Sequence, residues 1–483
     1  MSKVLSGESV VPTQFQFHKK GSVRHVEKRR NGTCAFADCV AQVSLAAYRK
    51  YIVPLRSSDD TSQICIAAIV AHFPPPFGPN ADNSAESKSE LSNFHVVGLG
   101  VGTKYLQEYL ITNESSDFGK RVRDCHAEVL ARRSFRRQIS LEILHDLHSD
   151  RNLDKPGDVH LPARVPIIER IAGSKSTYQL KEGVTIHFYS SSTPCGNSTI
   201  KKFTEMKKEK FDHSLHADEW PVSAHERIAP HSVKLGQFAL LLKRDDTIPK
   251  NSECEIVYPR FQEPPGTSLN CGMIHSCSDK ICRWNCLGLQ GSLLSRFFDK
   301  PIYMQTITVG RKFTNAVCRR AICCRAWGYK SSSSNGSYRL NHPSVMGTSV
   351  YIDEDGVVEM DQTTYGKNAI FESLCWVYWP GMVECEVECI DGTTGQLRLG
   401  EDSNISLIDN QQRSVSKVST FALFGTYRQI KHLVHAIPQS SSTELNKLSL
   451  EELKAVKKED SSEYDAAKEG FYRHRVFRTW KRR

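Results

Sequence analysis

Residues 121–138 read RVRDCHAEVLARRSFRRQ. Apolar residues recur at every fourth position from within this stretch onward, namely Ala127, Ala131, Phe135, Ile139, Ile143 and Leu147. This spacing is typical of one face of an α-helix. Asp124, just before the pattern, is the predicted N-cap, because its carboxylate can accept hydrogen bonds from free backbone amides. The stretch therefore predicts a long helix that begins close to His126.

His126 and Glu128 stand two residues apart at the predicted start of this helix. An imidazole in the first turn can bind zinc, and a carboxylate two residues later can face a water on the metal without being a ligand. His-Ala-Glu is short enough to occur by chance at an ordinary helix start. The catalytic interpretation therefore depends on finding further ligands.

Two cysteines further along the chain are the candidate partners. Cys195 lies in the Pro-Cys-Gly tripeptide 194–196, after the alternating strand pattern of residues 183–192. Cys277 opens a second predicted helix in SCSDK, residues 276–280. A helix N-terminus favours a thiolate, which is the form that binds metals. One His, two Cys and a Glu that is not a ligand make the set with which zinc deaminases activate water.

The spacing of the two cysteines separates this chain from most zinc deaminases. Their usual motif is Pro-Cys-x-x-Cys, but Ser198 stands at the fourth position here and the next candidate is Cys277. This departure from the usual spacing matches one branch of the zinc deaminases. The His-Ala-Glu, Pro-Cys-Gly and SCSDK motifs, followed by ICRWN (281–285) and GLQGS (288–292), resemble the deaminase domain shared by adenosine deaminases acting on RNA and on tRNA. The resemblance covers the chain from about residue 34 to its end.

The resemblance implies a cytidine-deaminase-like α/β fold, in which a mixed central sheet is flanked by helices and enlarged by insertions and a C-terminal helical region. It implies zinc (Zn²⁺) held by His126, Cys195 and Cys277, with Glu128 moving protons during hydrolytic deamination of adenosine to inosine. Thr103 and Lys104 match positions beside the target nucleotide.

The expected substrate is tRNA, and the resemblance suggests the adenosine 3′ of the anticodon in alanine tRNA. No double-stranded-RNA-binding module is evident before the domain. Thr199 stands where the messenger-editing relatives carry an arginine that contacts phosphate.

Several alternatives stay open. An editing deaminase of double-stranded or messenger RNA is the alternative within the class. A catalytically inactive RNA-binding homologue would keep the cations but lose the proton shuttle, whereas Glu128 is intact. A structural-zinc protein would need a fourth protein ligand, for which Cys125 is the nearest candidate. Glycines in residues 98–102 hint at a dinucleotide-binding loop, but the spacing of the third glycine and the acidic residue of that fingerprint are lacking.

Basic side chains are concentrated on the two predicted helices that carry His126 and Cys277. Helices that supply metal ligands have little exposed surface, and buried cations need counter-charge. The resembling proteins enclose inositol hexakisphosphate as a structural cofactor. The residues that match its site are Arg123, Val129, Arg132, Arg133, Lys280, Arg283, Trp284, Gly291, Ser292, Lys458, Tyr464, Lys468 and Trp480.

The composition agrees with an RNA partner. The chain has 483 residues, a net charge of +10 and 16 cysteines. Clustered Lys and Arg favour a polyanion. Cysteines without a signal peptide indicate reduced thiols in an intracellular protein, in the nucleus, the cytoplasm or both. No apolar run is long enough to span a membrane, and no obligate protein partner is evident.

We expect a disordered basic tail over residues 1–32 and one deaminase domain over residues 33–483. Within the domain, residues 74–92 form a loop insertion, and helices in residues 443–483 close the inositol polyphosphate site. The neighbours Cys323 and Cys324 are interpreted as packed thiols, because adjacent cysteines cannot easily both reach one tetrahedral metal.

Overall fold

The structure of the chain is a computed structural model. It describes residues 2–5, 35–55, 64–74, 90–106, 119–150, 166–199, 232–235, 238–241, 274–332, 336–350, 374–380, 385–398, 415–435, 453, 455–456, 462–474 and 477.

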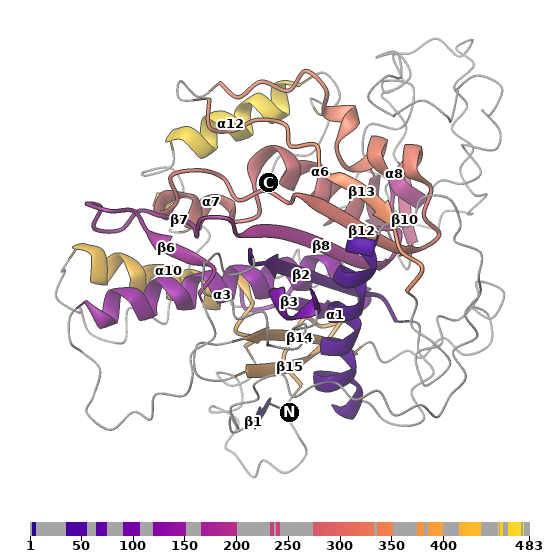
Figure 1. Cartoon of the computed structure of the whole chain (residues 1–483), viewed down its shortest axis with the longest axis horizontal. Coiled ribbons are helices and arrows are strands. Elements are labelled where there is room, and N and C mark those ends of the chain that lie inside the picture. The colour runs from indigo at the N-terminus through magenta and orange to yellow at the C-terminus, as the bar shows by residue number, and fades with distance from the viewer. Residues whose placement is uncertain are drawn as a thin grey trace, which may run out of the picture.

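An eight-stranded sheet forms the centre of the molecule (Figure 1), in the order β1-β15-β14-β3-β2-β8-β12-β13. Its strands are β1 (Ser2–Leu5), β2 (Ile66–His72), β3 (Phe94–Val101), β8 (Thr185–Ser192), β12 (Thr306–Arg311), β13 (Ser344–Gly347), β14 (Leu374–Pro380) and β15 (Cys385–Asp391). Strand β12 runs parallel to β8 and β13, while the other neighbours in this sheet are antiparallel. The predicted α/β class with a mixed central sheet is therefore confirmed.

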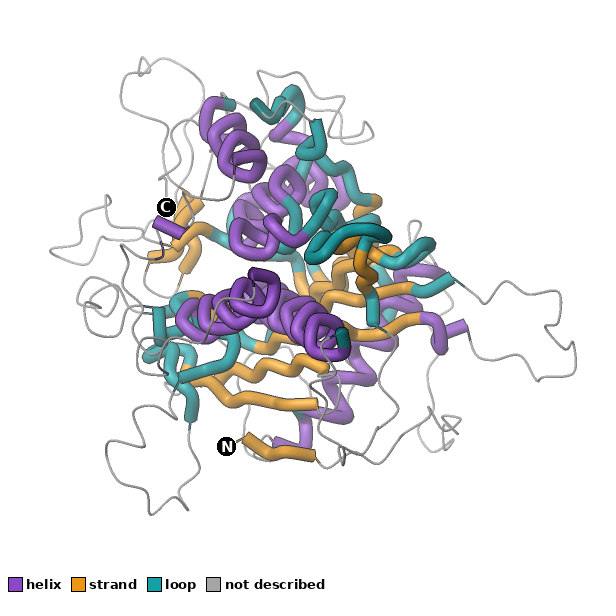
Figure 2. The backbone as a smooth tube through the Cα atoms, turned by 90° about the vertical axis from the view of Figure 1, so that its left-hand side faces the viewer, coloured by secondary structure: helices purple, strands orange, loops and turns teal. Residues whose placement is uncertain are grey.

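Helices cover both faces of this sheet (Figure 2). Helix α1 (Ala35–Tyr51) packs on one face and α3 (Ala127–Ser149) on the other. Alternate residues of β2 pack on opposite faces of the sheet. Ile66, Ala68 and Val70 pack on the α1 side. Ala67, Ile69 and Ala71 pack on the α3 side. Since successive side chains of a strand point to opposite faces, β2 is apolar at almost every position.

The other described α-helices follow α3 along the chain. They are α6 (Cys277–Leu287), α7 (Gly291–Leu294), α8 (Asn315–Ile322), α10 (Thr420–His435) and α12 (Ser462–Arg473). Helix α10 packs along α3, and α12 lies on α6 (Figure 1). None of the helices in the described part of the chain is both long and apolar enough to cross a membrane.

Among the described residues, short strands form three small sheets outside the central one. Strand β4 (Thr103–Tyr105) pairs with β5 (Asp124–His126), and β6 (Ile168–Arg170) pairs with β7 (Tyr178–Leu180). Strands β9 (Ser232–Leu235), β10 (Phe238–Leu241) and β11 (Ile274–His275) make the third. The β4–β5 pair positions the start of α3, because β5 ends at His126 and α3 begins at the next residue.

The glycines of β3 bring this strand close to α3. A Cβ atom at Gly98 would lie 2.5 Å from the backbone oxygen of Ala131, and one at Gly100 would lie 2.4 Å from that of Ala127. Only glycine permits this approach without movement of the helix. The glycine pattern thus reflects helix–sheet packing, in place of the alternative dinucleotide-binding loop.

The start of α3 differs from the prediction. His126 occupies the N-cap position without a capping side-chain hydrogen bond, and Asp124 lies in strand β5. Asp124 is therefore not the N-cap, because pairing with β4 keeps residues 124–126 extended. Residues 2–5 of the expected tail form the edge strand β1, and residues 6–34 lie outside the described part of the chain. Residues 75–89 of the expected insertion lie outside it too.

Candidate metal centre

Three side chains from separate segments meet at one point. His126 lies at the end of β5, Cys195 follows β8, and Cys277 is the first residue of α6. Their ligand atoms all lie within 4.8 Å of one another, although the two cysteines are 82 residues apart. The structure thus brings together the three ligands that the sequence suggested.

The His126 imidazole is held from one side. Its Nδ1 atom lies 2.9 Å from Oδ1 of Asp124 and 3.2 Å from the backbone oxygen of Lys104. With Nδ1 engaged in this way, Nε2 is the nitrogen left for a metal. The other carboxylate oxygen of Asp124 accepts a hydrogen bond from the Lys280 ammonium, so the ion pair ties β5 to α6.

The environment of Cys195 favours a thiolate. The backbone amide of Cys277, at the N-terminus of α6, lies 3.4 Å from the Cys195 sulfur, and that of Ser278 donates to the Cys195 carbonyl at 3.1 Å. Amide donors at a helix N-terminus stabilise a sulfur anion. The turn continues through Gly196 at φ +96°, a conformation that suits glycine.

A buried polar network joins the two cysteine-bearing turns. Asn197, two residues after Cys195, donates to Oδ1 of Asp279 at 3.4 Å. Arg325 donates to the same oxygen at 2.6 Å, and both side chains are almost completely buried. Arg320 donates to the carbonyl and the side-chain oxygen of Asn197 at 3.3 and 3.2 Å. These residues hold η3 (Asn197–Thr199) against α6 and thereby fix the separation of the cysteines.

The pKa values of the two arginines of this network are shifted in opposite directions. Burial lowers the pKa of Arg325, but the Asp279 carboxylate and Cys282 together outweigh this and raise it above its usual value. Burial and the nearby Arg325 charge lower the pKa of Arg320 to about 9. The sequence did not reveal this network. Its only sequence signal was the position of Asn197 and Asp279, each two residues after a candidate ligand.

Glu128 lies in the first turn of α3 and is 5% exposed. Its position two residues after the His126 ligand is as the sequence suggested. Within the described residues, the group of candidate ligands contains no fourth protein donor. Cys125, the candidate for that place, donates its thiol to the Val122 carbonyl at 3.5 Å. The centre thus offers three candidate ligands, with a carboxylate two residues after one of them, His126.

Thr103 and Lys104 lie beside this centre. In the β4–β5 pair, Thr103 is opposite His126 and Lys104 is opposite Cys125. Strand pairing therefore places both residues next to the imidazole, where the resemblance put the target nucleotide.

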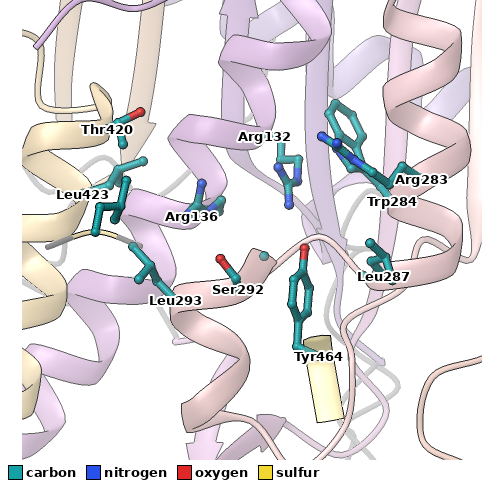
Figure 3. Close-up of a pocket in the computed structure, with 13 residues that line it drawn as sticks. Arg132, Arg136, Arg283, Trp284, Leu287, Ser292, Leu293, Thr420, Leu423 and Tyr464 are labelled. Carbon is teal, nitrogen blue, oxygen red and sulfur yellow. The ribbon is translucent and has the colours of Figure 1, made fainter. Parts of the chain in front are cut away.

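A basic cavity lies between α3, α6, α7 and α10 (Figure 3). Its volume is about 170 Å³. One water needs about 15 Å³ on the same measure, so the cavity has room for a larger ligand. Arg132 and Tyr464 point toward one another across it (Figure 3). The residues that line it are Arg132, Arg136, Arg283, Trp284, Leu287, Gly288, Gly291, Ser292, Leu293, Thr420, Leu423, Leu453 and Tyr464.

The cavity has hydrogen-bond donors without acceptors. The Nε atoms of Arg132 and Arg136 and the Nε1 atom of Trp284 are buried and have no hydrogen-bond partner among the described residues. Burial and the neighbouring Arg136 charge lower the pKa of Arg132 well below its usual value. Burial and Arg133 lower the pKa of Arg136 to about 10. An anion inside the cavity would supply both the missing acceptors and the missing counter-charge.

The predicted inositol phosphate residues fall into three groups. Those that line the cavity are Arg132, Arg283, Trp284, Gly291, Ser292 and Tyr464. Arg123, Val129, Arg133, Lys280 and Lys468 are described but do not line it, and Lys458 and Trp480 lie outside the described residues.

Helix geometry explains the main differences. Arg133 points to α10, where it donates to the Val418 carbonyl at 2.7 Å, while Lys280 contacts Asp124. Arg136 was missed, although its position four residues after Arg132 puts both on one face of α3.

Comparison with known proteins adds independent information. A family model for the adenosine-deaminase (editase) domain matches residues 98–483. The double-stranded RNA-specific adenosine deaminase of Mus musculus is 27% identical over 340 residues, which are 69% of this chain and 24% of that protein. The double-stranded RNA-specific editase B2 of Mus musculus is 26% identical over 84% of this chain and 46% of that protein. The tRNA-specific adenosine deaminase 1 of Drosophila melanogaster is 29% identical over 44% of this chain and 43% of that protein. The chain thus spans less than half the length of each of these relatives.

Proposed function

The chain belongs to the adenosine-deaminase (editase) family, and we propose that it is a zinc-dependent enzyme that hydrolyses adenosine to inosine in tRNA. The observation that carries this proposal is the meeting of His126, Cys195 and Cys277, with the Glu128 carboxylate two residues after the histidine. Inosine formation replaces the exocyclic amine of adenine by oxygen, with one water consumed and one ammonia released.

The donor set fits zinc. One imidazole and two thiolates suit this metal, and three protein ligands leave the fourth position for water, as in catalytic sites. A bound zinc ion supplies Lewis acidity, which makes water a sufficiently strong nucleophile near neutral pH. Asp124 keeps the His126 ring oriented, and the amide of Cys277 favours the thiolate of Cys195.

Glu128 carries the protons in this proposal. Its carboxylate accepts a proton from the attacking water and delivers it to N1 of the adenine ring. It then accepts the proton of the hydroxyl group added at C6 and delivers it to the departing ammonia, which leaves the C6 carbonyl of inosine. The buried position of Glu128 shields this exchange from bulk solvent. Thr103 and Lys104, next to His126, are placed to meet the ribose and phosphate of the target nucleotide.

The proposed substrate is a tRNA, specifically the adenosine 3′ of the anticodon in alanine tRNA. A base must leave its stack to reach the centre, and this costs least in a loop. The resemblance to tRNA-specific relatives and Thr199, where messenger-editing relatives carry an arginine, support this choice. A second candidate is editing of double-stranded RNA, which is favoured by the greater share of this chain that matches double-stranded-RNA-specific relatives.

The test is inosine formation by the purified, zinc-loaded chain. Alanine tRNA and a long RNA duplex are offered separately, and inosine is measured by mass spectrometry of the digested RNA. We expect inosine in the tRNA, and a fall of at least about 100-fold for Glu128→Gln. Glu182→Gln, at an exposed position, is the matched control and should be fully active. Inosine in the duplex alone would establish the second candidate, and equal inosine from wild type and Glu128→Gln would reject the deaminase proposal.

Inositol hexakisphosphate is the anion that we propose for the basic cavity. The support is the cluster of Arg132, Arg136 and Arg283, in which the buried Nε atoms of Arg132 and Arg136 have no acceptor among the described residues. Its role there would be structural, since it would neutralise the arginines between α3 and α6. Mass spectrometry of denatured wild-type protein should release one equivalent, and Arg132→Met together with Arg136→Met should abolish it. Wild-type protein that is folded and free of inositol phosphates would reject this assignment.

A further inference from the structure

A second cluster of metal-ligand side chains is formed by Cys323, Cys324 and His342. The Sγ atom of Cys323 lies 3.5 Å from Sγ of Cys324, which in turn lies 4.0 Å from Nδ1 of His342. All three ligand atoms lie within 4.8 Å of one another. We refer to these three residues as the Cys323 cluster. It shares no residue with the centre at His126.

The spacing within the cluster is that of ligands around one zinc ion. With zinc–sulfur bonds of about 2.3 Å and zinc–nitrogen bonds of about 2.0 Å, tetrahedral geometry puts two sulfurs about 3.8 Å apart, and a sulfur and a nitrogen about 3.5 Å apart. The observed separations of 3.5 and 4.0 Å differ from these values by only a few tenths of an ångström. Small side-chain rotations would therefore suffice to bind the ion.

The backbone removes the objection that adjacent cysteines cannot serve one metal. Cys323 ends α8 with φ −148° and ψ −55°, which is outside the helical region, and Cys324 begins the short helix η6 (Cys324–Ala326). The chain changes direction between the two residues, so their sulfurs lie side by side. The interpretation of Cys323 and Cys324 as packed thiols rested on their adjacency in the chain, which at this turn does not keep their sulfurs apart.

The surroundings allow an ion to enter from solvent. Both cysteines are completely buried, whereas His342 is exposed and forms the outer side of the cluster. Trp327 lies on the same side, with its ring 5.8 Å from that of His342 and 55% exposed. Among the described residues the cluster has no fourth His, Cys, Asp or Glu donor, so water would complete the coordination.

The charge balance also suits a divalent cation. Each thiol loses its proton to solvent on binding, and two thiolates with one divalent ion make an uncharged complex. Burial of an uncharged group avoids the large desolvation cost of an isolated ion.

We propose that Cys323, Cys324 and His342 bind a second zinc ion. Two thiolates and one imidazole select zinc over the harder cations that prefer oxygen ligands. The ion would join the α8–η6 junction to the segment before β13. The same junction carries Arg325, which holds Asp279 of the first centre. This proposal stands on its own geometry and does not require the deaminase function.

Zinc content of the whole chain tests the proposal. Wild-type protein, purified without chelator and measured by inductively coupled plasma mass spectrometry, should contain two zinc ions per chain. His342→Ala and Cys324→Ser should each contain one, and Cys277→Ser combined with His342→Ala should contain none. Cys318→Ser, which removes a buried thiol of α8 outside the cluster, is the matched control and should keep two. Wild-type zinc content in both His342→Ala and Cys324→Ser would overturn the proposal.

A spectroscopic measurement separates this cluster from the first centre. In the Cys277→Ser background, titration of the zinc-free chain with Co²⁺ should quench Trp327 fluorescence with a stoichiometry of one and give the sulfur-to-cobalt absorption of a thiolate complex. Trp327→Phe should lose the quenching but keep the absorption, and His342→Ala should lose both. Quenching and absorption that are unchanged in His342→Ala would contradict the assignment, whatever the outcome of the deaminase assay.

Discussion

The Nδ1 atom of His126 lies 2.9 Å from Oδ1 of Asp124, two residues earlier in strand β5. A carboxylate on one ring nitrogen fixes the tautomer and the orientation of the imidazole that faces a metal. Because the second oxygen of Asp124 accepts from Lys280 on α6, the orientation of His126 depends on how β5 and α6 are assembled. The ligand geometry is thus set by an ion pair between distant segments.

Asp124→Asn should weaken zinc binding by about 10- to 100-fold, because the amide keeps the shape of the carboxylate but loses the charge that pairs with Lys280 and orients His126. Competition with a chromogenic chelator measures the affinity. Asp299→Asn, at an exposed position, is the matched control and should bind like wild type. An unchanged affinity for Asp124→Asn would show that the ion pair does not position the ligand.

Arg325→Met should lower the free energy of unfolding by about 3 kcal/mol or more, because it removes the ion-pair partner of the buried Asp279 carboxylate. The double variant Asp279→Asn, Arg325→Met should recover part of this loss, since the unbalanced charge is gone. Urea unfolding in excess zinc measures both. A double variant that is less stable than Arg325→Met would contradict the proposed coupling.

Glu142 should make stability depend on pH. It is buried in α3 and accepts hydrogen bonds from the backbone amides of Ile167 and Ile168 at 3.0 and 3.2 Å. Burial raises its pKa from 4.5 to about 7, despite these hydrogen bonds. The folded state therefore binds the proton more tightly than the unfolded chain does. The associated stability is fully present below about pH 4.5 and is lost as the pH rises through about 7.

Glu142→Gln removes this titration. Relative to wild type, the variant should gain about 2 to 3 kcal/mol in free energy of unfolding between pH 5 and pH 8. Chemical denaturation of both proteins at the two pH values gives the comparison, in which groups common to both cancel. A stability difference that stays constant with pH would show that the pKa of Glu142 is not raised in the folded state.

Gly100→Ala and Gly425→Ala should have opposite effects. The new methyl group at Gly100 would meet backbone atoms of α3 at 2.4 and 2.5 Å, so we expect a loss of about 3 kcal/mol or more. At Gly425, within α10, the Cβ meets nothing within 4 Å, so alanine should stabilise the helix by about 0.5 to 1 kcal/mol. Thermal unfolding measures the stability of both variants relative to wild type. A Gly100→Ala variant as stable as wild type would show that α3 can move away from β3.

The parts of the site that lie within one element could be predicted from the sequence. The fourfold spacing from Ala127 fixed α3, and the interval of two residues fixed Glu128 relative to His126. Arg136 could have been found in the same way, because it follows Arg132 by one helical turn. Motif resemblance then supplied Cys195 and Cys277, which no local pattern links to His126.

Contacts between elements could not be predicted in this way. Asp124 has the side chain of an N-cap, but its pairing with β4 made it a strand residue that orients His126. Arg133 looked equivalent to Arg132, yet it points to α10 rather than into the cavity. In both cases the partner was provided by a segment distant in the sequence.

The sequence by itself determined the helix α3 and, through motif resemblance, the mixed α/β class and the candidate metal ligands. Periodicity and side-chain chemistry are local properties, so they can be read from a single segment. Only the tertiary structure decided that Arg325 pairs with Asp279 between the cysteine turns and that Cys323, Cys324 and His342 lie together. Such contacts depend on strand register, helix packing and backbone turns, which arise only when distant segments pack against one another.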